Sequence, residues 1–172
     1  MVDTTASWDA LDTINDPELP VSIVDLGMVQ SVSADSGRVG IDLAPTFVGC
    51  PALAVIEQEV RDKLAKLPGV ARVDINWVFD PPWSVDRISA AGREALRKHG
   101  VTVPPQGGLR PAPGAAPGSL IPLTASAPAE TIACPFCGSE ATTLESPFGP
   151  TRCKMIYYCQ ACRNSFEHFR QV

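Results

Sequence analysis

Residues 134–162 read CPFCGSEATTLESPFGPTRCKMIYYCQAC and contain two C-x2-C pairs with 21 residues between them. Each pair suits a tight turn whose backbone N–H groups face thiolates, and two such pairs can make a tetrahedral four-thiolate metal site. The segments 142–144 and 154–158 between the pairs are expected to be strands. The pattern therefore predicts a small metal-binding ribbon of β-hairpins. Its expected metal ligands are Cys134, Cys137, Cys159 and Cys162.

The residue types leave the identity of the metal open. Sites made only of thiolates suit both zinc and iron–sulfur clusters. A structural zinc site needs four cysteines, but this region has a fifth, Cys153. One interpretation of Cys153 is a small buried hydrophobic residue on a strand, and the other is a spare or exchanging ligand.

Residues 101–130 separate this ribbon from the rest of the chain. They contain seven prolines and four glycines, so we expect a semi-extended linker with neither a helix nor a central strand. The chain then divides into a first domain at 1–100, the linker at 101–130 and the cysteine-rich module at 131–172. The last of these is too small to bury a sufficient core and should need a metal.

The first domain shows alternating helical and strand patterns. Asp35-Ser36-Gly37 marks a turn between two strands, which predicts a hairpin. The order α-β-β-α-β-α predicts an α+β fold, an α/β sandwich. The expected helices cover 5–14, 52–67 and 85–98, the last capped by Ser84, and the expected strands cover 28–32, 39–43 and 70–79.

Cys50 is the second candidate for chemistry. If Pro51 opens the helix, Cys50 lies at its N-cap, where the helix dipole and free N–H groups would lower the pKa of the thiol. Thr46 and Gly49 belong to the loop that approaches it, and glycine would let a ligand or partner come close. The alternative is a buried structural cysteine.

The remaining polar candidates have simpler explanations. The carboxylates near the first helix fit turn and cap positions better than acid–base catalysis. His99 fits a cation at a helix C-terminus, and His168 fits a solvent-facing strand residue. Trp83 suits a partner-facing position as well as the core. The carboxylates concerned are Asp16, Glu18 and Asp25.

Composition excludes several classes of protein. No window approaches 18 consecutive apolar residues, which excludes a membrane helix. The N-terminal residues lack the pattern of a signal peptide, so a cytoplasmic protein is expected. A net charge of −5 argues against electrostatic binding of nucleic acid.

Several motifs together resemble known families. Asn15-Asp-Pro-Glu18, Ile23-Val-Asp-Leu-Gly27, Gly49-Cys50-Pro51 and Asp80-Pro-Pro-Trp83 resemble the SufT-like domain family of iron–sulfur assembly. The cysteine-rich end is similar to that of the PaaD (PaaJ) subunits of the phenylacetyl-CoA epoxidase system. The resemblance implies aerobic phenylacetate degradation and a non-catalytic maturation role, with Cys50 as the reactive cysteine that handles an iron–sulfur cluster.

The resemblance also implies partners. These are the di-iron oxygenase, the iron–sulfur flavin reductase or both, with a homodimer as a further candidate assembly. The expected cofactor at the C-terminal cysteines is zinc or an iron–sulfur cluster, and a transient cluster is expected at Cys50. The alternative function is a zinc-ribbon docking subunit whose metal is purely structural and which transfers no cluster.

Overall fold

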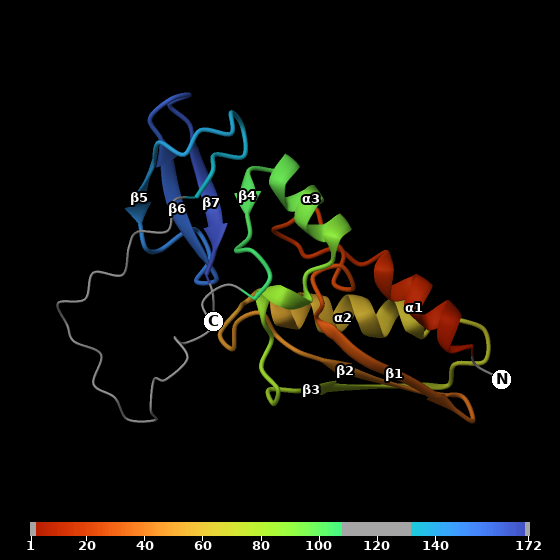
Figure 1. Cartoon of the computed structure of the whole chain (residues 1–172). Helices are drawn as coiled ribbons and strands as arrows, with labels where there is room; N and C mark the ends of the chain where they lie inside the picture. Colours follow the sequence, from red (N-terminus) through yellow and green to blue (C-terminus); the bar gives the residue numbers. More distant parts are fainter. Residues whose placement is uncertain (1–2, 108–131, 171–172) are drawn as a thin grey trace.

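The computed structural model describes residues 3–107 and 132–170. In the described residues the strands form two sheets, which are accompanied by three α-helices and one short 3-10 helix. In chain order the elements are α1 (Thr4–Asp12), β1 (Val29–Asp35), β2 (Arg38–Leu43), α2 (Ala52–Leu64), β3 (Arg72–Trp77), η1 (Val85–Arg87), α3 (Ala90–Lys98), β4 (Val101–Thr102), β5 (Thr142–Ser146), β6 (Lys154–Cys159) and β7 (Ser165–Phe169). The first sheet has the order β1-β2-β3, and the second has the order β4-β7-β6-β5. Helices α1 and α2 lie over one face of the first sheet (Figure 1). The predicted α+β class and the α-β-β-α-β-α order are confirmed.

The first two strands form the predicted hairpin. Asp35 pairs with Arg38, and the two residues between them, Ser36 and Gly37, both have positive φ angles of 48° and 85°. A two-residue turn with two positive φ angles matches the right-handed twist of the flanking strands. The turn seen in the sequence therefore sets the register of the pair.

Strand β2 and helix α2 supply much of the first core. Alternate residues of β2 face inward, so that Val39, Ile41 and Leu43 are fully buried. Strand β3 then runs parallel to β2 after the α2 crossover. The buried positions of α2 follow helical spacing, and they are Ala52, Ile56, Val60 and Leu64.

The prediction of one helix over 85–98 is wrong. The chain makes a single 3-10 turn capped by Ser84, becomes extended at Ile88, and starts α3 at Ala90. Ser89 causes the restart, because its hydroxyl oxygen accepts a hydrogen bond from the Gly92 N–H at 2.9 Å.

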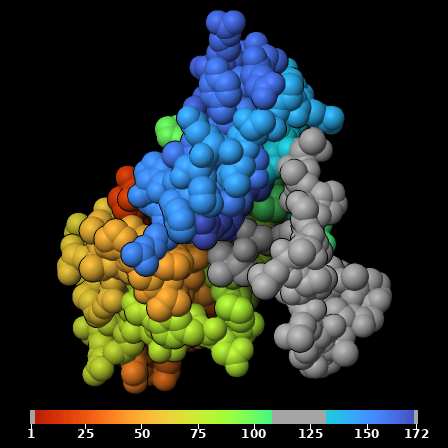
Figure 2. Space-filling view, turned by 90° about the vertical axis from the view of Figure 1, so that its left-hand side faces the viewer, coloured from red at the N-terminus to blue at the C-terminus, as the bar shows by residue number. Residues whose placement is uncertain are grey.

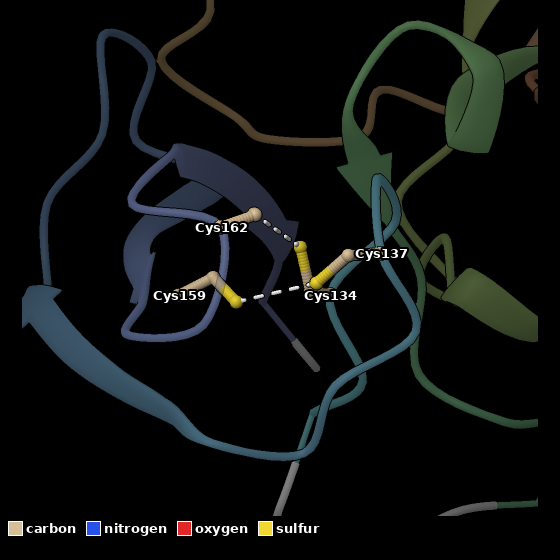
Figure 3. Close-up of side chains that lie close together, drawn as sticks. All are labelled: Cys134, Cys137, Cys159 and Cys162. Carbon is tan, nitrogen blue, oxygen red and sulfur yellow. Dashed lines mark hydrogen bonds between the residues drawn. The ribbon is translucent and has the colours of Figure 1, made fainter.

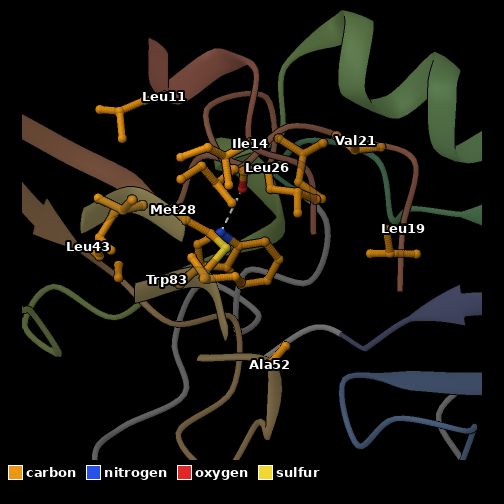
Figure 4. Packing of buried hydrophobic residues seen from close by; sticks show 14 of the residues in the cluster. Leu11, Ile14, Leu19, Val21, Leu26, Met28, Leu43, Ala52 and Trp83 are labelled. Atoms are coloured by element: carbon orange, nitrogen blue, oxygen red, sulfur yellow. Dashed lines mark hydrogen bonds between the residues drawn. The ribbon is translucent and has the colours of Figure 1, made fainter. Parts of the chain in front are cut away.

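Asp25 and Trp83 both form hydrogen bonds that hold neighbouring segments of the first domain together. Asp25, expected as a cap before Gly27, accepts hydrogen bonds from the Ser89 hydroxyl and, through its carbonyl, from the Ser89 N–H. Trp83 is a core residue with 3% of its surface exposed, and its indole N–H donates to the Leu26 carbonyl at 2.8 Å (Figure 4). Of the two positions considered for Trp83, the structure selects the core.

The ribbon packs directly against the first domain. Phe169 and Cys153, both from the C-terminal region, belong to the hydrophobic core that contains Trp83 and Leu26. The ribbon keeps a smaller core of its own, which consists of Ile132, Cys134, Cys159 and Phe166. The two parts of the chain are thus joined by buried apolar contacts, and their surfaces lie directly against each other in Figure 2.

Residues at the start of the expected linker contribute to the ribbon sheet. Strand β4 pairs in parallel with β7, with Val101 opposite Glu167 and Thr102 opposite His168. An edge strand needs only one neighbour, and Pro104 soon after it is compatible with such an edge. The part of the linker at 108–130 lies outside the described residues. Within the described ranges, no helix combines the length and apolar character needed to cross a membrane.

Candidate metal centre and thiol cavity

Four of the six cysteines come together at one end of the ribbon (Figure 3). Their sulfur atoms all lie within 4.8 Å of one another. The Sγ atoms of Cys134 and Cys162 are 3.6 Å apart, and those of Cys137 and Cys159 are also 3.6 Å apart. The structure therefore brings together the four residues that the sequence predicts as metal ligands.

The two C-x2-C pairs have the same backbone design. The Gly138 N–H donates to the Cys134 carbonyl at 2.9 Å, and the Arg163 N–H donates to the Cys159 carbonyl at 2.9 Å. Both donors have positive φ angles, of 73° and 59°. Glycine adopts this conformation without steric cost, whereas Arg163 is one of the non-glycine residues with a positive φ angle among those described. Each turn presents its two thiols on the same side, which is what a tetrahedral site requires.

The thiol cluster fits a metal cation. A zinc ion with zinc–sulfur bonds of about 2.3 Å sets its four sulfur ligands about 3.8 Å apart, close to the spacing found here. Four thiolates are also a ligand set of iron–sulfur clusters. The Asn164 side chain, with burial opposing it, lowers the pKa of Cys162 to about 6. A bound cation would favour the thiolate form of the other three cysteines as well.

Cys153 does not belong to this cluster. It directly precedes β6, is 8% exposed, and packs in the core of the first domain. Its carbonyl accepts the Arg170 N–H at 2.8 Å, and its sulfur lies 3.2 Å from the Thr151 hydroxyl oxygen. Cys153 is thus buried, as one interpretation held, but it stands in a turn before the strand and away from the four grouped thiols.

Cys50 lies just before helix α2. The helix begins at Ala52, with Pro51 at the N-cap position, so Cys50 is one residue earlier than expected. The backbone N–H groups of Ala52 and Leu53 still interact with its sulfur and act to lower its pKa. The start of the helix therefore supports the thiolate in the way the sequence suggested.

The expectation of a lowered pKa for Cys50 is nevertheless wrong. Burial raises the pKa of the thiol, and the carboxylates of Asp16 and Glu18 raise it further, so that the helix N–H groups are outweighed. Asp16 is the turn former that the sequence indicated, since it accepts the Glu18 N–H at 2.8 Å. Its charge and that of Glu18 also act on Cys50, which the sequence pattern did not reveal.

A cavity of about 210 Å³ brings Cys50 and Cys153 together. It lies between the loop that leads into α2 and the loop that leads into β6, where the ribbon rests on the first domain (Figure 2). Its wall contains both cysteines, the Glu18 carboxylate and an arginine. The lining residues are Glu18, Phe47, Gly49, Cys50, Pro51, Pro150, Thr151, Arg152 and Cys153. Thr46, in the loop that leads into α2, is 9% exposed and is not among the residues that line the cavity.

The two histidines lie elsewhere. His99 follows α3 as its C-cap residue and is exposed, as expected for a residue at a helix C-terminus. His168 is 4% exposed, so the prediction of a solvent-facing residue is wrong. Its Nδ1 lies 2.8 Å from the Thr102 hydroxyl oxygen, because β4 covers β7 on that side. Burial lowers the pKa of His168 to about 4.

Two protein families match separate parts of the chain. Residues 5–75 match the iron-sulfur cluster assembly protein family, and residues 121–170 match the PaaD zinc beta ribbon domain. An Escherichia coli (strain K12) protein, named as a candidate component of 1,2-phenylacetyl-CoA epoxidase, is 36% identical over 166 residues. That alignment covers 96% of this chain and 91% of the relative.

Other relatives match the first domain alone. The Fe-S protein maturation auxiliary factor YitW of Bacillus subtilis (strain 168) is 41% identical over 88 residues, 51% of this chain and 86% of YitW. The crystal structure of a DUF59 domain of unknown function from Bacillus anthracis superposes with a TM-score of 0.52 at 36% identity, covering 54% of this chain and 89% of that one. The chain therefore belongs to the PaaD family, in which an iron–sulfur cluster assembly domain is joined to a zinc β-ribbon domain.

Proposed function

We propose that this chain is a non-catalytic accessory subunit of the phenylacetyl-CoA epoxidase system, in the aerobic degradation of phenylacetate, and that it acts in maturation. Cys50 holds iron or an iron–sulfur cluster as cargo and passes it to another component in the cytoplasm. The observation that carries this proposal is the position of Cys50 on the wall of a cavity at the start of α2. Thr46 has the supporting role of a buried residue in the loop that leads to Cys50.

The surroundings of Cys50 favour cargo binding over catalysis. Burial raises the pKa of its thiol, and the charged groups that act on the thiol, Asp16 and Glu18, raise it further, whereas a nucleophilic cysteine needs a partner that lowers its pKa. A thiophilic cation would replace the proton and be attracted by the same carboxylates. The relatives of the first domain are named as iron–sulfur maturation factors, which supports the same role.

The recipient of the iron or iron–sulfur cargo is inferred from the Escherichia coli relative that matches nearly the whole chain. That protein is named as an epoxidase subunit, so the recipient on this proposal is the di-iron oxygenase or the iron–sulfur flavin reductase of such a system. On this proposal the chain consists of a first domain at 1–100, a linker at 101–130 whose strand β4 pairs in the ribbon sheet, and a cysteine-rich module at 131–172. The ribbon cysteines Cys134, Cys137, Cys159 and Cys162 are proposed as ligands of a resident zinc ion.

A second function has its own support. The four ribbon sulfurs have the spacing of ligands on one ion, and the ribbon is held to the first domain by β4 and by Phe169. A ribbon of this kind could serve as a docking module with a structural zinc ion and no transfer of iron. In that case Cys50 would bind no cargo and would have no part in the function.

Metal analysis of anaerobically purified protein separates the two functions. Zinc, iron and sulfide are measured for the wild type, Cys50→Ser and Cys137→Ser after reconstitution with ferrous iron and sulfide. The same proteins are then mixed with the metal-free flavin reductase, and its recovered iron–sulfur absorption is followed.

Maturation predicts that the wild type binds iron in addition to zinc and restores the reductase, and that Cys50→Ser does neither while it retains zinc. One zinc per chain, no iron and no transfer in the wild type would support the docking function instead. Size-exclusion chromatography of the same samples establishes whether the chain is a homodimer.

A further inference from the structure

We propose that Cys50 and Cys153 together form a second thiolate site, separate from the ribbon cluster, in which one cysteine comes from each part of the chain. The occupant is one thiophilic metal centre, and its identification as the iron cargo rests on the proposed function. The inference assigns a ligand role to Cys153 that neither the ribbon pattern nor the family matches provide.

Cys50 and Cys153 border the same space. Both line the 210 Å³ cavity between the α2 loop and the loop before β6. Cys153 belongs to the core cluster of the first domain and Cys50 packs against it, whereas the ribbon cysteines Cys134 and Cys159 belong to the other core. Cys50 and Cys153 are close enough for the negative charge of one thiolate to raise the pKa of the other thiol.

The backbone holds Cys153 at the cavity. The hydrogen bond from the Arg170 N–H to its carbonyl fixes the turn to the end of β7, and the Thr151 hydroxyl contacts its sulfur. The neighbouring Lys154 forms an ion pair with Glu167 at 2.7 Å, and its positive charge also acts on Cys153. Its ammonium group is therefore already matched by a carboxylate.

The cavity offers further ligands suited to such a metal. Glu18 contributes a carboxylate to the wall, and Asp16 lies close enough to act on Cys50. Two thiolates with a carboxylate suit Fe²⁺, Co²⁺ or Zn²⁺, since sulfur ligands favour thiophilic ions and the carboxylates add negative charge. Each Sγ–H bond breaks, its proton passes to water, and a metal–sulfur bond forms, with no change of oxidation state.

The donor set gives this site a reason to be selective. Sulfur ligands favour thiophilic ions, whereas Mg²⁺ prefers oxygen ligands in octahedral geometry.

Cobalt is a direct probe of the site. Anaerobic protein whose ribbon is loaded with zinc is titrated with Co²⁺, and thiolate-to-cobalt charge-transfer absorption and bound cobalt are measured. The wild type is expected to bind one cobalt ion per chain while it retains its zinc. The variants Cys50→Ser and Cys153→Ser are each expected to bind cobalt at least tenfold more weakly with about half of the absorption, and the double variant is expected to show neither.

Zinc content serves as the control for folding. Each variant must keep one zinc per chain, and Cys153→Ala replaces the serine variant if that protein loses its zinc. Glu18→Gln is expected to weaken cobalt binding less than either cysteine variant does. Wild-type binding in both Cys153→Ser and Cys153→Ala, or no cobalt bound by the wild type, would overturn the inference.

The result separates this inference from the proposed function. If both cysteines are needed for cobalt but the wild type transfers no iron to the reductase, the site stands and the maturation role fails. If iron transfer requires Cys50 while cobalt binding and transfer are unchanged in Cys153→Ser, the maturation role stands and the two-cysteine site is refuted.

Discussion

The ring of Phe169, in the last strand of the ribbon, lies 6.2 Å from the ring of Trp83 in the core of the first domain. Both side chains are buried, with 0% and 3% of their surfaces exposed. This aromatic pair joins two parts of the chain that are far apart in sequence. The turn containing Cys153 and the loop containing Cys50 pack against the same core and line one cavity.

Removing the ring of Phe169 should destabilise the whole molecule. Phe169→Ala is expected to lower the free energy of unfolding by about 3–5 kcal/mol, the usual cost of deleting a fully buried aromatic side chain. Urea unfolding of the zinc-loaded protein measures the loss. Phe79→Ala, at a side chain that is 54% exposed, is the matched control and should change stability by no more than about 0.5 kcal/mol. Equal effects of the two variants would refute the coupling.

Removing the ribbon metal should loosen one sheet more than the other. The ribbon core is small and contains two of the four clustered cysteines, so chelation is expected to speed amide hydrogen exchange in β6 and β7. Strands β1 to β3 should retain most of their protection. Cys137→Ser is expected to lose zinc, whereas Cys153→Ser keeps it. Loss of zinc from both variants to the same extent would contradict the separation of the two cysteine sites.

The carboxylates beside Cys50 should suppress its reactivity. A negative charge near a thiol disfavours the thiolate and raises the pKa, so removal of that charge must lower the pKa and increase the thiolate fraction at pH 7. Glu18→Gln and Asp16→Asn are each expected to raise the rate of alkylation of Cys50 by iodoacetamide severalfold in protein with an empty cavity. Mass spectrometry of the Cys50 peptide follows the reaction.

The control for this measurement is Glu59→Gln, an exposed carboxylate on α2 that does not line the cavity. Its alkylation rate should equal that of the wild type. A slower reaction in Glu18→Gln or Asp16→Asn would show that these carboxylates act on Cys50 in the opposite direction.

His168 should make stability fall in mild acid. Burial lowers its pKa from 6.5 to about 4 in the folded state, so the unfolded chain binds the proton more readily between these values. Stability is therefore full above pH 6.5 and decreases as the pH falls towards 4, by about 3 kcal/mol from this group.

His168→Gln should remove this part of the pH dependence. Glutamine can still hydrogen-bond the Thr102 hydroxyl but carries no titratable group. Urea unfolding of both proteins at pH 7 and pH 5 makes the comparison, and because both lose zinc alike in acid, their difference isolates the imidazole. Parallel losses of stability in the two proteins would show that the imidazole does not contribute.

Local signals in the sequence were enough for several parts of this structure. The Asp35-Ser36-Gly37 turn predicts the hairpin because a two-residue turn with positive φ angles is a short-range property. The spacing of Ile56, Val60 and Leu64 predicts the buried face of α2 for the same reason. The helix expected over 85–98 failed because two caps, Ser84 and Ser89, compete within one apolar pattern.

The local chemistry of this protein could be predicted from the order of its residues: the two C-x2-C turns, the cysteine at the start of a helix, and the α-β-β-α-β-α order. These features depend on residues a few positions apart, so their spacing carries the information. Folding in three dimensions was needed to show that Cys153 leaves the ribbon cluster and shares a cavity with Cys50. It was also needed to show that carboxylates and burial outweigh the helix N–H groups at Cys50. Both outcomes arise because electrostatics and packing act through space, between groups whose separation along the chain says nothing of their distance.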